Sequence, residues 1–256
     1  MARVSQVAPL AFAPPPPPLN GMKRASTATA PSESSTPRAK RVKRGVIAIE
    51  DIKIKELNVA LTKMSTTTGK ELESIDFKAS VNLTPTKDEW IDTPFGLKDR
   101  LVDSTELPSF MGGSSKETWL PLTLKVDDEV KDRINAIDAA LLGKSSFEGE
   151  ARVSAKEYEE MLIMNVRVQL ANNVVQTPIT IINDDGKHTG HGWTFLAPFM
   201  ESHRNFKGSI CKVCVSPSFV WTVDKKKGVV WQVDRLVLKP GQKVIELQDD
   251  PFADVE

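Results

Sequence analysis

The chain has 256 residues, which is enough for one domain of ordinary size with tails but too few for two large domains. Its 34 basic and 34 acidic residues give a formal net charge of zero, so the overall charge favours neither a polyanion-binding nor a membrane-surface protein. Two cysteines exclude a disulfide scaffold, and no run approaches the roughly 18 apolar residues that a membrane helix needs. We therefore expect a soluble, intracellular protein that does not bind membranes.

The charges are distributed unevenly along the chain. Residues 1–45 hold eight basic side chains and one acidic side chain, a balance of +7, so residues 46–256 carry −7. Prolines at 14–18 and a Ser/Thr/Ala/Pro-rich run at 25–37 bury too little apolar surface to fold, which predicts a disordered arm over 1–45. The arm ends in a basic cluster of Arg38, Lys40, Arg41, Lys43 and Arg44. Such a cluster suits a nuclear-import signal or a phosphate contact, and a solubilising tail is the alternative.

A β-rich domain is expected over 46–245. Alternation of apolar and polar residues predicts strands over 46–57 and 77–83. A helix is predicted between Asp127, which supplies a cap, and Gly143, which supplies a stop. Its apolar residues recur at helical spacing, namely Val130, Ile134, Ile137 and Leu141. After it, 154–158 reads as a short helical start and 161–170 as leading into a strand.

The C-terminal third is rich in strand and turn signals. Strands are predicted over 174–182 and 210–215, with a turn at 183–186 between them. A hairpin follows, with strands at 219–223 and 229–238 around the turn 224–228. If Val223 faces Val229, the register also sets Trp221 opposite Trp231 and Phe219 opposite Val233.

At least six strand-like segments and one clear helix predict a mainly β fold, a barrel or sandwich with a helical insert. Catalytic motifs are missing: there is no phosphate-binding Gly-rich loop with Lys-Ser/Thr, no dinucleotide-binding glycine fingerprint and no Gly-x-Ser-x-Gly elbow. We therefore expect a protein that is not an enzyme and uses no cofactor.

Two histidines and two cysteines have spacings that a zinc site could use. These residues are His188, His191, Cys211 and Cys214. However, both cysteines fall in a predicted strand, where residues three apart point to opposite faces. Ordinary core packing of the cysteines is therefore the favoured interpretation, and no metal is expected.

Aromatic and basic residues are interleaved in the C-terminal third, as in proteins that stack bases and contact the phosphate backbone of single strands. The candidate rings are Trp193, Phe195, Phe199, Phe206, Trp221 and Trp231, of which Trp193 and Phe206 are expected to be exposed and half or more of the six to be core. The candidate cations are Lys187, Arg204, Lys207, Lys212, Lys225, Lys226, Lys227 and Arg235. These residues predict sequence-independent binding of single-stranded DNA.

The hairpin Ser218–Leu238, with its basic, glycine-containing turn, resembles the closing hairpin of single-stranded DNA-binding proteins of large DNA viruses and phages. The acidic tail 246–256 is similar to the tails with which that family contacts replication proteins, and its matching residues are Asp249, Asp250, Phe252 and Asp254. The resemblance implies an OB-fold, a five-stranded barrel that binds oligonucleotides, and a role in DNA replication or recombination. It places the protein in the nucleus or at a viral replication site inside the cell.

Two other functions fit the same layout. A basic arm ahead of a β-rich domain is also typical of small viral capsid or nucleocapsid proteins, whose arm neutralises the genome. A nuclear chromatin or transcription accessory factor would keep the arm and lose the preference for single strands. The sequence leaves the formation of homo-oligomers open.

Overall fold

The computed structural model describes residues 45–65, 71–97, 119–171, 174–203 and 206–242. All of these residues belong to one compact unit of the chain. The predicted basic arm, the acidic tail and Arg204 lie outside the described residues. Within the described ranges, no helix has the length and apolar character needed to cross a membrane.

The described residues form a mainly β structure, as predicted, with fourteen strands and two α-helices. The strands before the first α-helix are β1 Gly45–Ala48, β2 Ala60–Ser65, β3 Glu71–Asp76, β4 Ala79–Asn82, β5 Ile91–Thr93 and β6 Trp119–Lys125. Those between the two α-helices are β7 Glu150–Arg152, β8 Ala155–Tyr158, β9 Met161–Ala171, β10 Val174–Val175, β11 Ile179–Asn183 and β12 Gly186–Gly190. The longest are β13 Ser209–Val223 and β14 Lys226–Lys239. The α-helices are α1 Asp128–Leu142 and α2 Trp193–His203.

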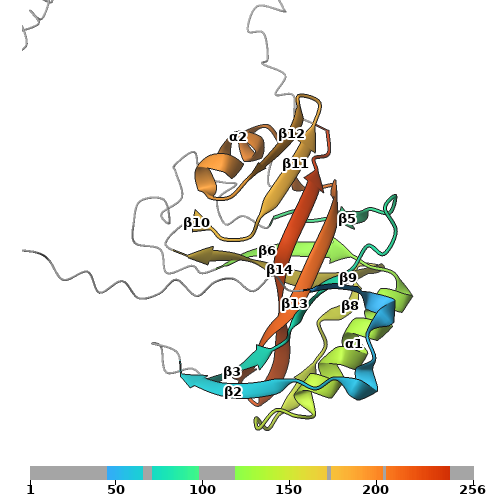
Figure 1. Cartoon of the computed structure of the whole chain (residues 1–256), viewed down its shortest axis with the longest axis vertical. Coiled ribbons are helices and arrows are strands. Elements are labelled where there is room, and N and C mark those ends of the chain that lie inside the picture. The colour runs from blue at the N-terminus through green and yellow to red at the C-terminus, as the bar shows by residue number, and fades with distance from the viewer. Residues whose placement is uncertain (1–44, 66–70, 98–118, 172–173, 204–205, 243–256) are drawn as a thin grey trace, which may run out of the picture. The chain divides into compact units, whose positions relative to one another are not determined.

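The antiparallel pair β13–β14 is the centre of the sheet (Figure 1). The main path of paired strands runs β1-β4-β13-β14-β11-β12, with β3 and β5 also pairing with β13. β9 pairs with β14 at one point and carries β6 and β8 on its two edges. In the described residues this path does not close on itself, so the sheet is open.

The register of the β13–β14 hairpin differs from the predicted one. Val223 pairs with Lys226, Trp221 with Gly228 and Phe219 with Val230. The reason is the turn, which has only two residues, Asp224 and Lys225, with φ of 49° and 58°. Both residues adopt the left-handed conformation of a type I′ turn, whose twist matches that of the paired strands. The sequence predicted a five-residue turn over 224–228, and this wrong length is why every predicted cross-strand pair differs from the observed one.

β13 is one continuous strand, whereas the sequence predicted two strands separated at Ser216 and Pro217. Register shifts occur between Cys214 and Val215 and between Pro217 and Phe219. Bulges of this kind insert an extra residue and bend the strand without ending it. The proline is therefore accommodated next to a bulge inside the strand.

α1 matches the helix predicted from the sequence. The Asp127 carboxylate caps it by accepting a hydrogen bond from the Val130 N–H at 2.7 Å. The predicted apolar residues Val130, Ile134, Ile137 and Leu141 are all buried. On the same helix, Asp138 Oδ1 accepts a hydrogen bond from Trp231 Nε1 at 2.9 Å, which fixes α1 against β14.

Several local predictions were wrong or incomplete. Of the strand predicted over 46–57, only residues 46–48 are extended, as part of β1, and two 3-10 turns follow, Ile49–Asp51 and Ile54–Glu56. Within 77–83, only β4 is a strand. Residues 155–158 are the strand β8, because Glu159 and Glu160 take positive φ and turn the chain back into β9. Residues 174–182 contain two strands, and α2 was not predicted at all.

Candidate nucleic-acid interface

Alternation along β13 divides its side chains between a buried face and a second face. Val213, Val215 and Val220 are essentially inaccessible to solvent. Phe219 and Trp221 flank Val220 and therefore project from the opposite side, where both are half-buried. We call this side of the β13–β14 sheet the outer face.

β9 and β6 add two residues to the outer face. Arg167 of β9 pairs with Gln232 of β14, and Trp119 of β6 pairs with Gln169 of β9. The Arg167 guanidinium lies 4.1 Å from the centre of the Trp119 ring and 5.7 Å from the centre of the Phe219 ring. Trp119, Arg167 and Phe219 thus form one arginine–aromatic cluster, built from three strands.

The cluster combines charge, stacking surface and access to solvent. Trp119 is 37% exposed. Burial lowers the pKa of Arg167 from its usual value, but a guanidinium stays protonated at neutral pH. A planar cation beside two rings is a surface on which a nucleobase can stack.

Polar side chains connect the strands beside the cluster. Gln232 Nε2 donates a hydrogen bond to Gln169 Oε1 at 2.9 Å, and Ser218 Oγ donates to Gln232 Oε1 at 3.3 Å. These bonds link β9, β14 and β13 on the outer face. They order the polar side chains that lie beside the cluster.

A second cation–ring pair lies farther along β13. Lys212 Nζ is 4.7 Å from the centre of the Trp90 ring. Lys212 pairs with Val237, and Cys214 pairs with the exposed Arg235, so both basic residues belong to the side of the hairpin away from the buried Val213. At about 3.3 Å per residue, Lys212 and Trp221 are separated by about 30 Å along the strand. Basic and aromatic side chains thus follow the length of the outer face.

The structure corrects two of the predicted binding rings. Phe206, expected to be exposed, is fully buried, and its ring stacks on His203 with centroids 6.0 Å apart. Trp231 is 1% exposed, and its buried indole N–H is paired with Asp138. Trp221 lies on the outer face, whereas the half-buried Phe195 and Phe199 belong to α2. Trp193 begins α2, and its side chain lies outside the described part of the chain.

The predicted cations also have different surroundings. Lys227 Nζ donates to the carbonyls of Leu142 and Phe147 at 3.1 and 2.8 Å, so it ties the hairpin to the end of α1. Lys227 therefore has a structural role, which corrects its predicted assignment to the binding surface. The exposed candidates are Lys187, Lys207, Lys225, Lys226 and Arg235, and Lys212 is half-buried.

The two cysteines follow the packing interpretation. Burial, together with the charge of Asp92, raises the pKa of Cys211 to about 12. Burial also raises the pKa of the Cys214 thiol, with a smaller opposing effect from Arg235. A metal needs the thiolate form, which these surroundings disfavour. No group of three or more His, Cys, Asp or Glu side chains arranged for a metal occurs in the described ranges.

Sequence reasoning missed Trp119 and Arg167 as site residues. Arg167 had a usable signal, because it stands between Val166 and Val168 in an apolar strand and so must face away from the core. Trp119 is distant in sequence, and only the β6–β9 pairing brings it to Arg167.

A scan against protein-family models and a search of curated proteins each found no match to this chain. The geometry of the outer face is therefore the basis for assigning a function.

Proposed function

We propose that this protein binds single-stranded DNA, without catalysis and without sequence preference, on the outer face of the β13–β14 sheet. The observation that carries the proposal is the arginine–aromatic cluster, in which the Arg167 guanidinium lies against the Trp119 and Phe219 rings. Every base offers a flat face for stacking, so such a surface binds single strands irrespective of their sequence.

The mechanism combines stacking with contacts to phosphates. A base enters beside the partly exposed Trp119 ring, and Arg167 supplies a charge that a neighbouring phosphate neutralises. Lys226 at the hairpin turn and Arg235 farther along β14 are exposed cations that extend the path for the backbone. A duplex keeps its bases stacked on one another and offers no free faces to these rings.

The resemblance of the hairpin Ser218–Leu238 to single-stranded DNA-binding proteins supports the same function. The OB-type barrel, the role in replication or recombination and the partner contacts of the acidic tail belong to this proposal. Binding on the outer face requires only the strands β6, β9, β13 and β14, so it does not depend on a closed barrel.

The proposal is tested by replacing members of the cluster. Trp119→Ala should weaken binding of an oligothymidine strand about 5- to 150-fold, because one base stack contributes about 1–3 kcal/mol. Arg167→Ala should weaken it similarly and reduce the dependence of affinity on salt. Affinity is measured by fluorescence anisotropy of a labelled oligothymidine at two salt concentrations.

Two control variants separate the cluster from general effects on the surface. Tyr158→Ala removes an aromatic side chain that is 43% exposed and packs on Phe95. Arg133→Ala removes a cation from α1, which packs against the buried face. Neither should change the affinity. The proposal fails if the Trp119 and Arg167 variants bind oligothymidine as tightly as these controls.

A further inference from the structure

A second concave site lies between α2 and the β11–β12 hairpin, away from the outer-face cluster. Close packing of the helix on the hairpin depends on Gly190, where a Cβ atom would come within 2.7 Å of the Phe195 ring. Phe195 contacts Phe199, one helical turn later, with ring centroids 5.7 Å apart. Phe199 in turn reaches His188 of β12, with centroids 5.4 Å apart. These contacts set the helix above the hairpin.

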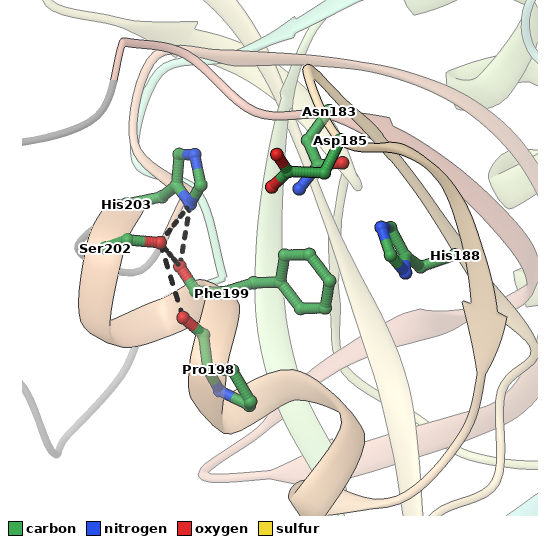
Figure 2. A pocket seen from close by; sticks show the side chains of 7 residues that line it. All are labelled: Asn183, Asp185, His188, Pro198, Phe199, Ser202 and His203. Atoms are coloured by element: carbon green, nitrogen blue, oxygen red, sulfur yellow. Dashed lines mark hydrogen bonds between the residues drawn. The ribbon is translucent and has the colours of Figure 1, made fainter.

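The space that remains beneath the helix is a pocket of about 250 Å³. Its walls come from the hairpin and from the last turns of α2, and its lining residues are Asn183, Asp185, His188, Pro198, Phe199, Ser202 and His203. Figure 2 shows the Phe199 ring projecting from α2 toward His188, with Asn183 and Asp185 on the hairpin side.

Two polar atoms at this pocket are buried and have no hydrogen-bond partner among the described residues. They are Asn183 Oδ1 and His188 Nε2. Asn183 pairs with Gly186, and His188 pairs with Ile181, so the two side chains are diagonal neighbours on one face of the hairpin. Diagonal neighbours on paired strands are about 7–8 Å apart. The residue directly opposite Asn183 is Gly186, which has no side chain to fill the space between Asn183 and His188. Buried polar groups nearly always have a partner, so this pair indicates a missing ligand or water.

The polar groups on the helical wall of the pocket are already engaged. Ser202 Oγ donates to the carbonyls of Pro198 and Phe199, each at 3.3 Å. His203 Nδ1 lies 2.9 Å from the Phe199 carbonyl oxygen and 2.8 Å from Ser202 Oγ. The pocket therefore has a closed helical wall, and its free hydrogen-bonding capacity is on the hairpin.

We propose that this pocket binds a nucleobase that carries an exocyclic amino group. Asn183 Oδ1 and the Asp185 carboxylate accept hydrogen bonds, so they match the amino group of cytosine, adenine or guanine. His188 Nε2 meets a ring nitrogen, as donor or acceptor according to its tautomer. Phe199 covers the base from the helix side. Thymine and uracil lack the amino group and offer only the N3–H as a donor, so at least one of the two acceptors stays unpaired.

This inference deepens the proposed function. Stacking on the outer face has no sequence preference, and the pocket, which is built from separate residues, adds selectivity for the base at one position only. The base could come from a bound strand or from a free nucleotide. Both sources present the same chemistry, and the experiment distinguishes them.

The test uses the full chain labelled with ¹⁵N on histidine, titrated with cytidine and, separately, with thymidine. The signal is the ¹⁵N resonance of His188 Nε2, and affinity is measured in parallel by calorimetry. Cytidine should shift this resonance and bind with a dissociation constant on the order of 0.1–1 mM, as expected for a ligand of this size. Thymidine should bind about tenfold more weakly or worse, because an acceptor stays unpaired.

His188→Leu should lower cytidine affinity about tenfold, whereas the matched variant His191→Leu, which removes an exposed imidazole next to β12, should leave it unchanged. If His188→Leu fails to fold, the response of the His188 resonance in the wild-type protein to cytidine and thymidine still tests the inference. Equal binding of cytidine and thymidine, or no movement of the His188 resonance with either, would overturn the inference and leave an ordered water as the occupant.

Oligocytidine and oligothymidine identify the source of the base. A shift of the His188 resonance with oligocytidine assigns the pocket to a base of the bound strand, and a shift with cytidine alone assigns it to a free nucleotide. Oligothymidine binding that depends on Arg167 but does not move His188 supports the outer face independently. The two proposals can therefore fail separately.

Discussion

Asp138 is a carboxyl group placed inside the core by the packing of α1 on β14. Burial raises its pKa from 3.8 to about 6, although hydrogen bonds from Trp231 and Ser154 act to lower it. The native state therefore binds this proton more tightly than the unfolded chain does. Stability from this group is fully present below about pH 4, falls as pH rises toward 6 and is constant above that.

Asp138→Asn tests this linkage. Because the amide does not ionise, the free energy of unfolding of the variant relative to wild type should rise by about 2 kcal/mol between pH 4 and pH 7. Urea unfolding at several pH values gives the difference directly. Parallel stability profiles for the two proteins would show that Asp138 does not titrate in this range.

The pKa of Glu73 is shifted in the opposite direction from that of Asp138. The pH dependence of stability must therefore be compared between wild type and the Asp138→Asn variant. Its burial acts to raise the pKa, but hydrogen bonds from Ser145 and Ser146, with the charge of Lys63, lower it below the usual value of 4.5. Stability from Glu73 is present above pH 4.5 and is lost as pH falls through its lowered pKa. The wild-type profile alone therefore mixes both groups.

The elements differ in how far their sequences determine them. α1 was predictable because the Asp127 cap, the spacing of its apolar residues and the stop at Gly143 act locally. α2 was not, because Pro198 lies inside it and its apolar residues pack on a hairpin that is joined to distant β14. The strand predicted over 46–57 ends at Ala48 because buried Ile49 and Ile52 are three residues apart, which suits a 3-10 turn.

The backbone of the β13–β14 turn is strained at its two central residues. Asp224 and Lys225 both adopt positive φ, which side chains disfavour and which Asn-Gly adopts readily. Replacing the pair by Asn-Gly should raise the free energy of unfolding by about 1 kcal/mol, measured by urea denaturation. Lys226→Gly, one residue later in extended β14, should instead lower it by about 0.5–1 kcal/mol. Equal effects of the two changes would contradict the turn geometry.

At the scale of the whole molecule, the candidate site depends on connections between distant segments. Composition and alternation predict the mainly β class and the two faces of β13 and β14. They do not predict that β6 and β9 bring Trp119 and Arg167 to Phe219, because that placement depends on strand pairing across about 100 residues. The two-residue turn likewise decides that Trp221 faces Gly228 and leaves Trp231 in the core. The mainly β class was within reach of the sequence, and the strand pairings that assemble the cluster were not.

The measurement that tests the central claim most directly is photo-crosslinking of oligothymidine to the full chain, with the linked residues identified by mass spectrometry. The account predicts crosslinks at Trp119, Phe219 and Trp221, all on the outer face, and loss of most of them in Arg167→Ala. Crosslinks confined to α1 or to the basic cluster 38–44, with none on the outer face, would contradict it.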